Sequence, residues 1–207
     1  MRLKIYCEII LKVCQNEKIL AAAAFTWVKQ GDFAAAVKLF KKAQQIDNNI
    51  DLNPKTEELD KNPQALAAMA FVYQGKELVR DGKVKEAIEA YKKALKINPD
   101  LEISAEDWNM LCWNGAINKQ AQDVMFACEN AVKLASQNEV AFAYRSRGVA
   151  RALTGDKQGA IKDFGVYVNS VDDKNREKSR VEGWIKELQN NKNPFTEEVL
   201  EKLRRRR

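Results

Sequence analysis

This sequence of 207 residues contains no histidine. The side chains that remain best suited to chemistry are four cysteines and one adjacent pair of carboxylates. Without histidine, the usual general base, the catalytic triads that use it and most zinc sites are excluded. Glu197 and Glu198 are neighbours on an exposed turn and point apart, so they need no catalytic role. We therefore expect a protein that is not an enzyme and that has no cofactor and no metal site.

The four cysteines are Cys7, Cys14, Cys112 and Cys128, and no two of them have the C-x-x-C spacing. Each lies on an apolar stripe, so we expect reduced cysteines that serve as packing residues. Cys112 and Cys128 fall on the two predicted helices of one unit, where they can be neighbours. A redox role for this pair stays open.

The net charge of +6 comes largely from the basic tail 204–207, four arginines that leave +2 for the rest of the chain. With 45% hydrophobic and 31% charged residues, the chain has the composition of a folded protein. Lys4, Glu8 and Lys12 interrupt the apolar start of the chain, so no membrane span is expected. We predict a soluble cytoplasmic protein.

The elements that position these residues are helices, and residues 82–99 show their pattern most clearly. Gly82 turns the chain, and the next residues place Ala87, Tyr91 and Ala94 on one apolar stripe that ends at Asn98-Pro99. Two alanines allow a partner helix to approach closely, and the tyrosine fills the space between them. The pattern predicts the second half of a helix hairpin.

The same order of turn glycine, small residues and aromatic residue recurs after Gly31 and Gly155, with a weaker copy over residues 121–136. The pattern resembles the tetratricopeptide repeat, a helix hairpin of about 34 residues. The resemblance implies an all-α fold, an α-α superhelix of about four hairpins in a single domain. The predicted repeats are residues 17–50, 68–101, 105–138 and 141–174.

Three segments lie outside these repeats. Residues 1–16 are predicted to extend the first helix, which starts near Arg2 and continues to Gln30 unless Asn16 breaks it. Three roles are open for this extension: it caps the first repeat, it forms a homodimer, or it packs against a missing part of a larger protein. The insertion 51–67 holds two Asn-Pro pairs that predict a short helix over 55–60 and a longer one over 63–80. Residues 175–203 are predicted to form capping helices, the last of them starting at Asn193-Pro194.

Residues 105–203 resemble a more specific module, because PFTEEVLEKLR at 194–204 is not part of the generic repeat. The similar module is bacterial, of a type common in cyanobacteria, and often ends multidomain signalling proteins. The resemblance implies an interaction or regulatory module, and it carries over no catalytic residue. Whether this chain is a whole protein or part of a larger one is left open.

In tetratricopeptide arrays the first helix of each hairpin lines a concave groove that holds another chain. The corresponding outward residues here are predicted to be Phe25, Lys29, Tyr73, Lys76, Arg80, Asn109, Trp113, Ile117, Arg145 and Val149. This mixture suits a protein or peptide partner with an apolar anchor flanked by acidic residues. The alternative to a binding role is that these are ordinary half-buried residues.

Two other functions remain as alternatives to a protein-binding scaffold. One is a nucleic-acid-associated adaptor that uses the basic tail and Lys92, Lys93 and Lys96, although these lysines are interleaved with acidic residues, as is typical of a solvated helix surface. The other is a regulatory module of a larger bacterial signalling protein. For Arg147 and Arg151, which lie one turn apart, we expect intramolecular pairing with Asp156 and Asp163.

Overall fold

The computed structural model describes residues 2–30, 32–47 and 63–205, and helices are the regular elements found in these ranges. The predicted turn at Gly31, the short helix predicted over 55–60 and the last two arginines lie outside the described residues. Contacts divide the chain into two compact units. Unit 1 is Met1–Gly75 with Glu89–Leu101, and unit 2 is Lys76–Ile88 with Glu102–Arg207.

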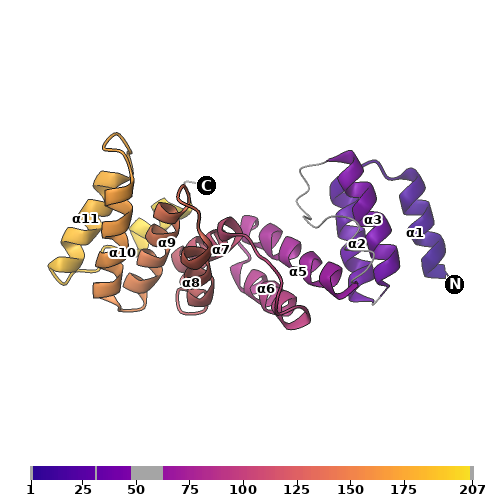
Figure 1. Cartoon of the computed structure of the whole chain (residues 1–207), viewed down its shortest axis with the longest axis horizontal. Coiled ribbons are helices and arrows are strands. Elements are labelled where there is room, and N and C mark those ends of the chain that lie inside the picture. The colour runs from indigo at the N-terminus through magenta and orange to yellow at the C-terminus, as the bar shows by residue number, and fades with distance from the viewer. Residues whose placement is uncertain (1, 31, 48–62, 206–207) are drawn as a thin grey trace. The chain divides into compact units, whose positions relative to one another are not determined.

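Unit 1 contains α1 (Arg2–Val13), α2 (Glu17–Lys29) and α3 (Phe33–Ile46). Asn16 separates α1 from α2, because its side-chain Oδ1 accepts a hydrogen bond of 3.0 Å from the backbone N–H of Ile19 and so caps the second helix. Helices α2 and α3 pair, and α1 lies against α3 (Figure 1). The first 30 residues therefore form two helices, with the break at the residue that the sequence offered for it.

The next hairpin consists of α5 (Pro63–Arg80) and α6 (Val84–Ile97), and both helices contribute residues to both units. Helix α5 begins at Pro63 and ends at Arg80, as the second Asn-Pro pair predicts. The turn between α5 and α6 contains Gly82 at φ 77°, a left-handed conformation that glycine adopts without steric cost. The expected turn glycine is confirmed.

Unit 2 contains the hairpin of α7 (Ala105–Ile117) with α8 (Met125–Leu134) and that of α9 (Val140–Leu153) with α10 (Lys157–Ser170). Helices α7 and α10 begin at side-chain caps, in which Ser104 accepts from the N–H of Asp107 and Asp156 from that of Gly159. Gly155 makes the second turn at φ 90°. The first turn has no glycine and contains Lys119 at φ 66°.

The two hairpins of unit 2 stack, since α9 contacts both α7 and α8, and α11 (Lys178–Gln189) covers α10 (Figure 1). The last helix, α12 (Glu197–Arg204), contacts α7. It starts at Thr196, whose hydroxyl accepts a hydrogen bond from the Val199 N–H, and not at Asn193-Pro194 as the sequence suggested. Phe195 is buried before the helix begins.

An aromatic ring packed on a glycine closes two of the hairpins. A Cβ atom added to Gly75 would lie 2.4 Å from Cε2 of Tyr91, and one added to Gly148 would lie 2.6 Å from Cε1 of Phe164. Both distances are too short for any side chain larger than hydrogen, so the ring touches the backbone of the opposite helix. In each hairpin the aromatic residue follows its glycine by 16 residues.

These elements establish the expected fold class, all-α, built of helix hairpins as in an α-α superhelix. In the part of the chain that the structure describes, no helix is both long enough and apolar enough to cross a membrane.

Candidate functional site

The most unusual side chain of unit 2 is Arg145 on α9, whose guanidinium lies against three aromatic rings. Its Cζ atom is 4.8 Å from the ring centroid of Trp113, 5.3 Å from that of Tyr167 and 5.6 Å from that of Phe142. Cation-π attraction of this kind holds the flat guanidinium in place without neutralising its charge. Trp113 comes from α7 and Tyr167 from α10, so three helices build the cluster.

Arg145 has no salt bridge to any acidic side chain among the described residues, and its buried Nε atom has no hydrogen-bond partner there. The other faces of the cluster differ in exposure: Tyr167 is fully buried, Trp113 is half-buried and Phe142 is 42% exposed. The cluster therefore combines an uncompensated cation with apolar surface that solvent reaches.

Asn109 extends this surface along α7, because it lies one helical turn before Trp113 on the same side of the helix. It is half-buried, and its buried Oδ1 atom has no hydrogen-bond partner within the described part of the chain. We call the set Asn109, Trp113, Phe142 and Arg145 the α7/α9 face. It offers N–H donors, a carbonyl acceptor and two rings.

The two other cations predicted for the groove in this unit are already paired within the chain. Lys76 Nζ lies 3.0 Å from the Asp107 carboxylate, with only 13% and 12% of the two side chains exposed. Arg80 pairs with Glu77 one turn earlier on α5. Of the predicted groove residues in unit 2, Arg145 is thus the cation without a carboxylate partner among the described residues.

Ile117 and Val149 lie in the core, with no exposed surface. They support the helices behind the α7/α9 face and offer no side-chain surface to a ligand. The backbone carbonyl of Ile117 accepts a hydrogen bond of 2.8 Å from Nε of Arg204 on α12.

The predicted groove residues of unit 1 form a separate aromatic cluster. Phe25 stacks on Tyr73 with ring centroids 5.4 Å apart, and it meets the buried ring of Phe40 edge-on at 5.3 Å. Phe25 and Tyr73 are both half-buried. The side chain of Lys29 lies outside what the structure describes.

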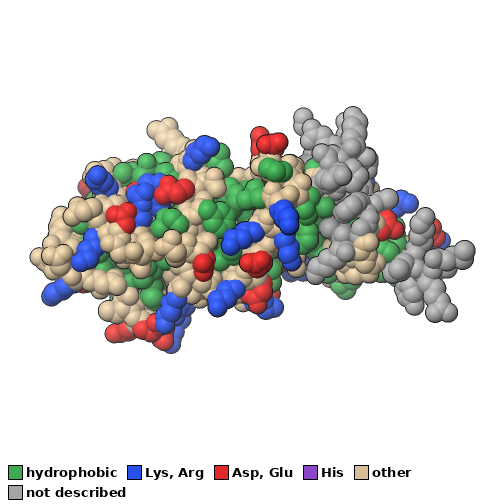
Figure 2. Space-filling model, turned by 90° about the horizontal axis from the view of Figure 1, so that it is seen from below, with side chains coloured by type: hydrophobic (Ala, Val, Ile, Leu, Met, Phe, Trp, Pro, Cys, Tyr) green, Lys and Arg blue, Asp and Glu red, His purple; other side chains and the backbone are tan. Residues whose placement is uncertain are grey.

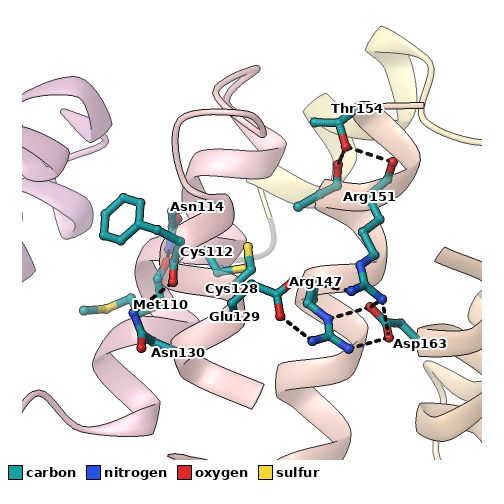
Figure 3. The surroundings of a disulfide bond; sticks show 12 residues. Met110, Cys112, Asn114, Cys128, Glu129, Asn130, Arg147, Arg151, Thr154 and Asp163 are labelled. Atoms are coloured by element: carbon teal, nitrogen blue, oxygen red, sulfur yellow. Dashed lines mark hydrogen bonds and ion pairs between the residues drawn. A yellow bond between two sulfur atoms is a disulfide. The ribbon is translucent and has the colours of Figure 1, made fainter. Parts of the chain in front are cut away.

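Arg147 and Arg151 of α9 are paired within the chain, as their spacing predicted (Figure 3). Arg147 donates two hydrogen bonds of 2.8 Å to the Asp163 carboxylate, and Arg151 donates to the same group at 3.0 Å. Arg151 also lies 3.7 Å from Asp156. Sequence reasoning missed Glu129 on α8, which binds Arg147 at 2.7 Å and Arg151 at 3.3 Å.

The Arg147–Asp163 pair is the buried centre of this network, with 10% and 3% of the two side chains exposed, whereas 50% of the Glu129 side chain is exposed. Burial opposes the charge of the guanidinium, but the hydrogen bonds and negative charges of Asp163 and Glu129 outweigh burial and raise the pKa of Arg147. The network links α8, α9 and α10 through ions that are satisfied internally.

Cys112 and Cys128 form a disulfide bond between α7 and α8, so the expectation that both are reduced packing residues is wrong (Figure 3). Cys7 and Cys14 are free thiols. Both bonded cysteines are fully buried, and their Cα atoms are 4.8 Å apart. Cys128 follows Cys112 by 16 residues, the separation found between Gly75 and Tyr91 and between Gly148 and Phe164. This separation of 16 residues is the feature of the sequence that could have indicated the bond.

Comparison with known proteins finds a family match within one of the hairpins. Residues 75–103 match the sequence model of the TPR repeat. The chain is also similar to a solved structure, the crystal structure of the P58(IPK) TPR domain, with 15% identity over 98% of this chain and 61% of that chain, and a TM-score of 0.46. No curated protein matches it. The match at 75–103 covers the turn at Gly82, so the segment from which the repeat was predicted is similar to a TPR repeat, a family that generally serves in protein-protein interaction.

Proposed function

We propose that the protein is a protein-protein interaction adaptor and that it binds a partner segment at the α7/α9 face. The observation that carries this proposal is the Arg145 guanidinium, which is fixed by three rings and has no carboxylate partner among the described residues. The neighbouring arginines of the same helix, Arg147 and Arg151, are both neutralised by Asp163 and Glu129. The difference leaves Arg145 for a ligand.

The partner that fits this face is a peptide or protein segment with an apolar or aromatic anchor next to an acidic residue. A guanidinium donates two parallel hydrogen bonds to a carboxylate, and aromatic backing fixes the plane in which it does so. Trp113 and Phe142 supply apolar area for the anchor, and half-buried tryptophan is a frequent centre of binding energy at interfaces. Asn109 can accept a hydrogen bond from a backbone N–H of the same segment.

The nucleic-acid alternative gains no support from the surface charge. On the face drawn in Figure 2, basic and acidic side chains are interspersed and do not gather into a patch of one sign. The exposed side of α6 likewise carries both signs of charge, Glu86 and Glu89 together with Lys85, Lys92, Lys93 and Lys96. The cyanobacterial-type module, the role in a larger signalling protein, the cytoplasmic location and the homodimer through α1 stay predictions.

The test selects peptides from a random displayed library on the immobilised full chain and measures their affinity by fluorescence anisotropy. Arg145→Glu is expected to weaken binding by about tenfold or more, which corresponds to about 1.4 kcal/mol, because it places a carboxylate where the ligand carboxylate should bind. Trp113→Ala removes the anchor surface and should weaken binding similarly.

The matched controls are Lys162→Glu, the same charge reversal at an exposed position of α10, and Leu134→Ala, which truncates an exposed apolar residue of α8. Both should bind as the parent does. Thermal unfolding of each variant shows whether it is folded, and Arg145→Gln repeats the test without the new charge. Unchanged affinity in folded Arg145 and Trp113 variants would remove the α7/α9 face as the binding site.

A further inference from the structure

The disulfide occupies the place that a ring packed on a glycine takes in two other hairpins. In α5–α6 the pair is Gly75 and Tyr91, in α9–α10 it is Gly148 and Phe164, and in α7–α8 the positions with the same separation of 16 residues are Cys112 and Cys128. The first two contacts are pure packing and do not depend on redox conditions. The third is a covalent bond that a reductant can remove.

We propose that the Cys112–Cys128 disulfide regulates the α7/α9 face, so that the oxidised protein binds its partner and the reduced protein binds it weakly. This inference rests on the proposed function. Reduction by a dithiol breaks the bond between the two sulfur atoms; two electrons and two protons pass to them and give two thiols, while the dithiol becomes a disulfide.

Reduction leaves the α7–α8 hairpin without an equivalent of the ring contact. Two thiols cannot approach as closely as two bonded sulfur atoms, so reduction pushes the two sulfur atoms apart, and we expect the helices to shift where the cysteine Cα atoms now lie 4.8 Å apart. Neither thiol supplies the apolar area with which Phe164 or Tyr91 fills the corresponding space. The packing that remains in this hairpin includes Gly115, where an added Cβ would lie 2.2 Å from Val124, and the edge-on contact of Trp108 with Phe126, whose ring centroids are 5.8 Å apart.

Each end of the bond is one residue away from a group that contacts α9. Trp113 follows Cys112 and backs the Arg145 guanidinium. Glu129 follows Cys128 and holds Arg147 and Arg151 (Figure 3). A shift between α7 and α8 therefore moves both supports of the helix that carries Arg145, which couples the redox state to the α7/α9 face.

Two features of the α7–α8 hairpin favour local opening, through which a reductant would reach the buried bond. Helix α8 has 10 residues, and its N-cap, Val124, makes no side-chain cap hydrogen bond. The preceding turn contains Lys119 in the left-handed region, which is unfavourable for a residue with a Cβ atom. A short, uncapped helix opens locally more often than the rest of a domain.

The test uses the full chain, purified without reductant, before and after treatment with dithiothreitol. Thiol labelling of the denatured protein should find two free thiols before treatment and four after it, since the sequence has four cysteines. The affinity for a peptide selected as above should fall about tenfold on reduction, and amide hydrogen exchange in α8 and α9 should become faster. Cys14→Ser, which removes a free thiol, serves as the control and should respond as the parent does.

Two variants lacking the bond separate its loss from other effects of the reductant. Cys112→Ser with Cys128→Ser should bind weakly in both conditions, whereas Cys112→Gly with Cys128→Phe should rebuild a ring-on-glycine contact and bind equally well in both. Four free thiols in the untreated protein, or equal affinity and equal exchange before and after reduction, would overturn the inference.

The outcomes also separate this inference from the proposed function. If Arg145→Glu weakens binding and reduction does not, the binding face stands and the redox coupling falls. If no selected peptide binds the oxidised protein through Arg145 and Trp113, the proposed function fails. The amide exchange rates of α8 and α9 before and after reduction then test the coupling by themselves.

Discussion

The hairpins α7–α8 and α9–α10 have similar lengths and lie side by side in unit 2, yet they are held together by different chemistry. In α9–α10 the Phe164 ring packs on Gly148, and the buried Arg147–Asp163 pair joins the two helices. In α7–α8 a disulfide takes the place of the ring. One architecture can thus be closed by packing or by a covalent bond, and only the second depends on redox conditions.

The two hairpins also differ in the residue that makes the turn. Gly155 makes the α9–α10 turn without steric cost, whereas Lys119 adopts a positive φ in the α7–α8 turn. That turn is braced by α12, because Glu197 pairs with Lys119 at 2.6 Å and Arg204 donates to the Ile117 carbonyl. The α7–α8 hairpin therefore relies on contacts from outside its own sequence.

The largest expected effect comes from a substitution that breaks the ion pairs of α9–α10. Asp163→Asn removes the carboxylate that Arg147 and Arg151 share and leaves two guanidinium groups with Glu129 and Asp156 alone, so we expect a loss of about 3 kcal/mol in the free energy of unfolding. Urea denaturation of the full chain measures it. Asp123→Asn, an exposed change of the same kind, should cost little. A loss at Asp163 no greater than at Asp123 would show that the network does not hold this hairpin.

A smaller effect tests the ring-on-glycine contact. Gly148→Ala forces a Cβ atom against the buried Phe164 ring and should lower the free energy of unfolding by about 1–3 kcal/mol. Gly165→Ala is the matched control, because no atom lies within 4 Å of its added Cβ and alanine favours helix. If thermal unfolding showed the same midpoint shift for both variants, the Gly148–Phe164 contact would not contribute specifically to stability.

The smallest effect concerns the brace at Lys119. Hydrogen bonds from Lys119 and then Arg204 lower the pKa of Glu197 from its ordinary value of 4.5. A carboxyl group with a lowered folded-state pKa stabilises the fold above its unfolded-state pKa, and this contribution is lost as pH falls through the folded-state pKa. The parent should therefore be slightly more stable than Glu197→Gln at pH 7 and should lose that advantage below about pH 4.5. A stability difference between the parent and Glu197→Gln that stays constant down to pH 3 would contradict a stabilising role for the Lys119–Glu197 pair.

The sequence predicts those parts of the fold that depend on local chemistry. Gly82 and Gly155 make the turns, Asn16 breaks the first helix, and Pro63 begins α5, because each is a property of one residue and its neighbours. The spacing of charged residues on α9 likewise predicts the pairing of Arg147 and Arg151. Helical periodicity and capping rules suffice for such features.

The candidate site could not be predicted to the same degree. The rings around Arg145 come from α7, α9 and α10, and which ring meets the guanidinium depends on how the helices stack. The same limit hid the role of Glu129 and the burial of Ile117 and Val149. The disulfide is an intermediate case, since the 16-residue separation is visible in the sequence but bond formation depends on the distance between α7 and α8.

The most direct measurement uses the four tryptophan indole N–H signals in a ¹⁵N-correlated NMR spectrum of the oxidised protein during titration with a selected peptide. Trp27, Trp108 and Trp184 are buried, whereas Trp113 is half-buried beside Arg145. The signal of Trp113 should shift with the binding curve while the other three stay nearly unchanged. A peptide that binds and shifts another tryptophan signal but leaves Trp113 unchanged would contradict the assignment of the α7/α9 face.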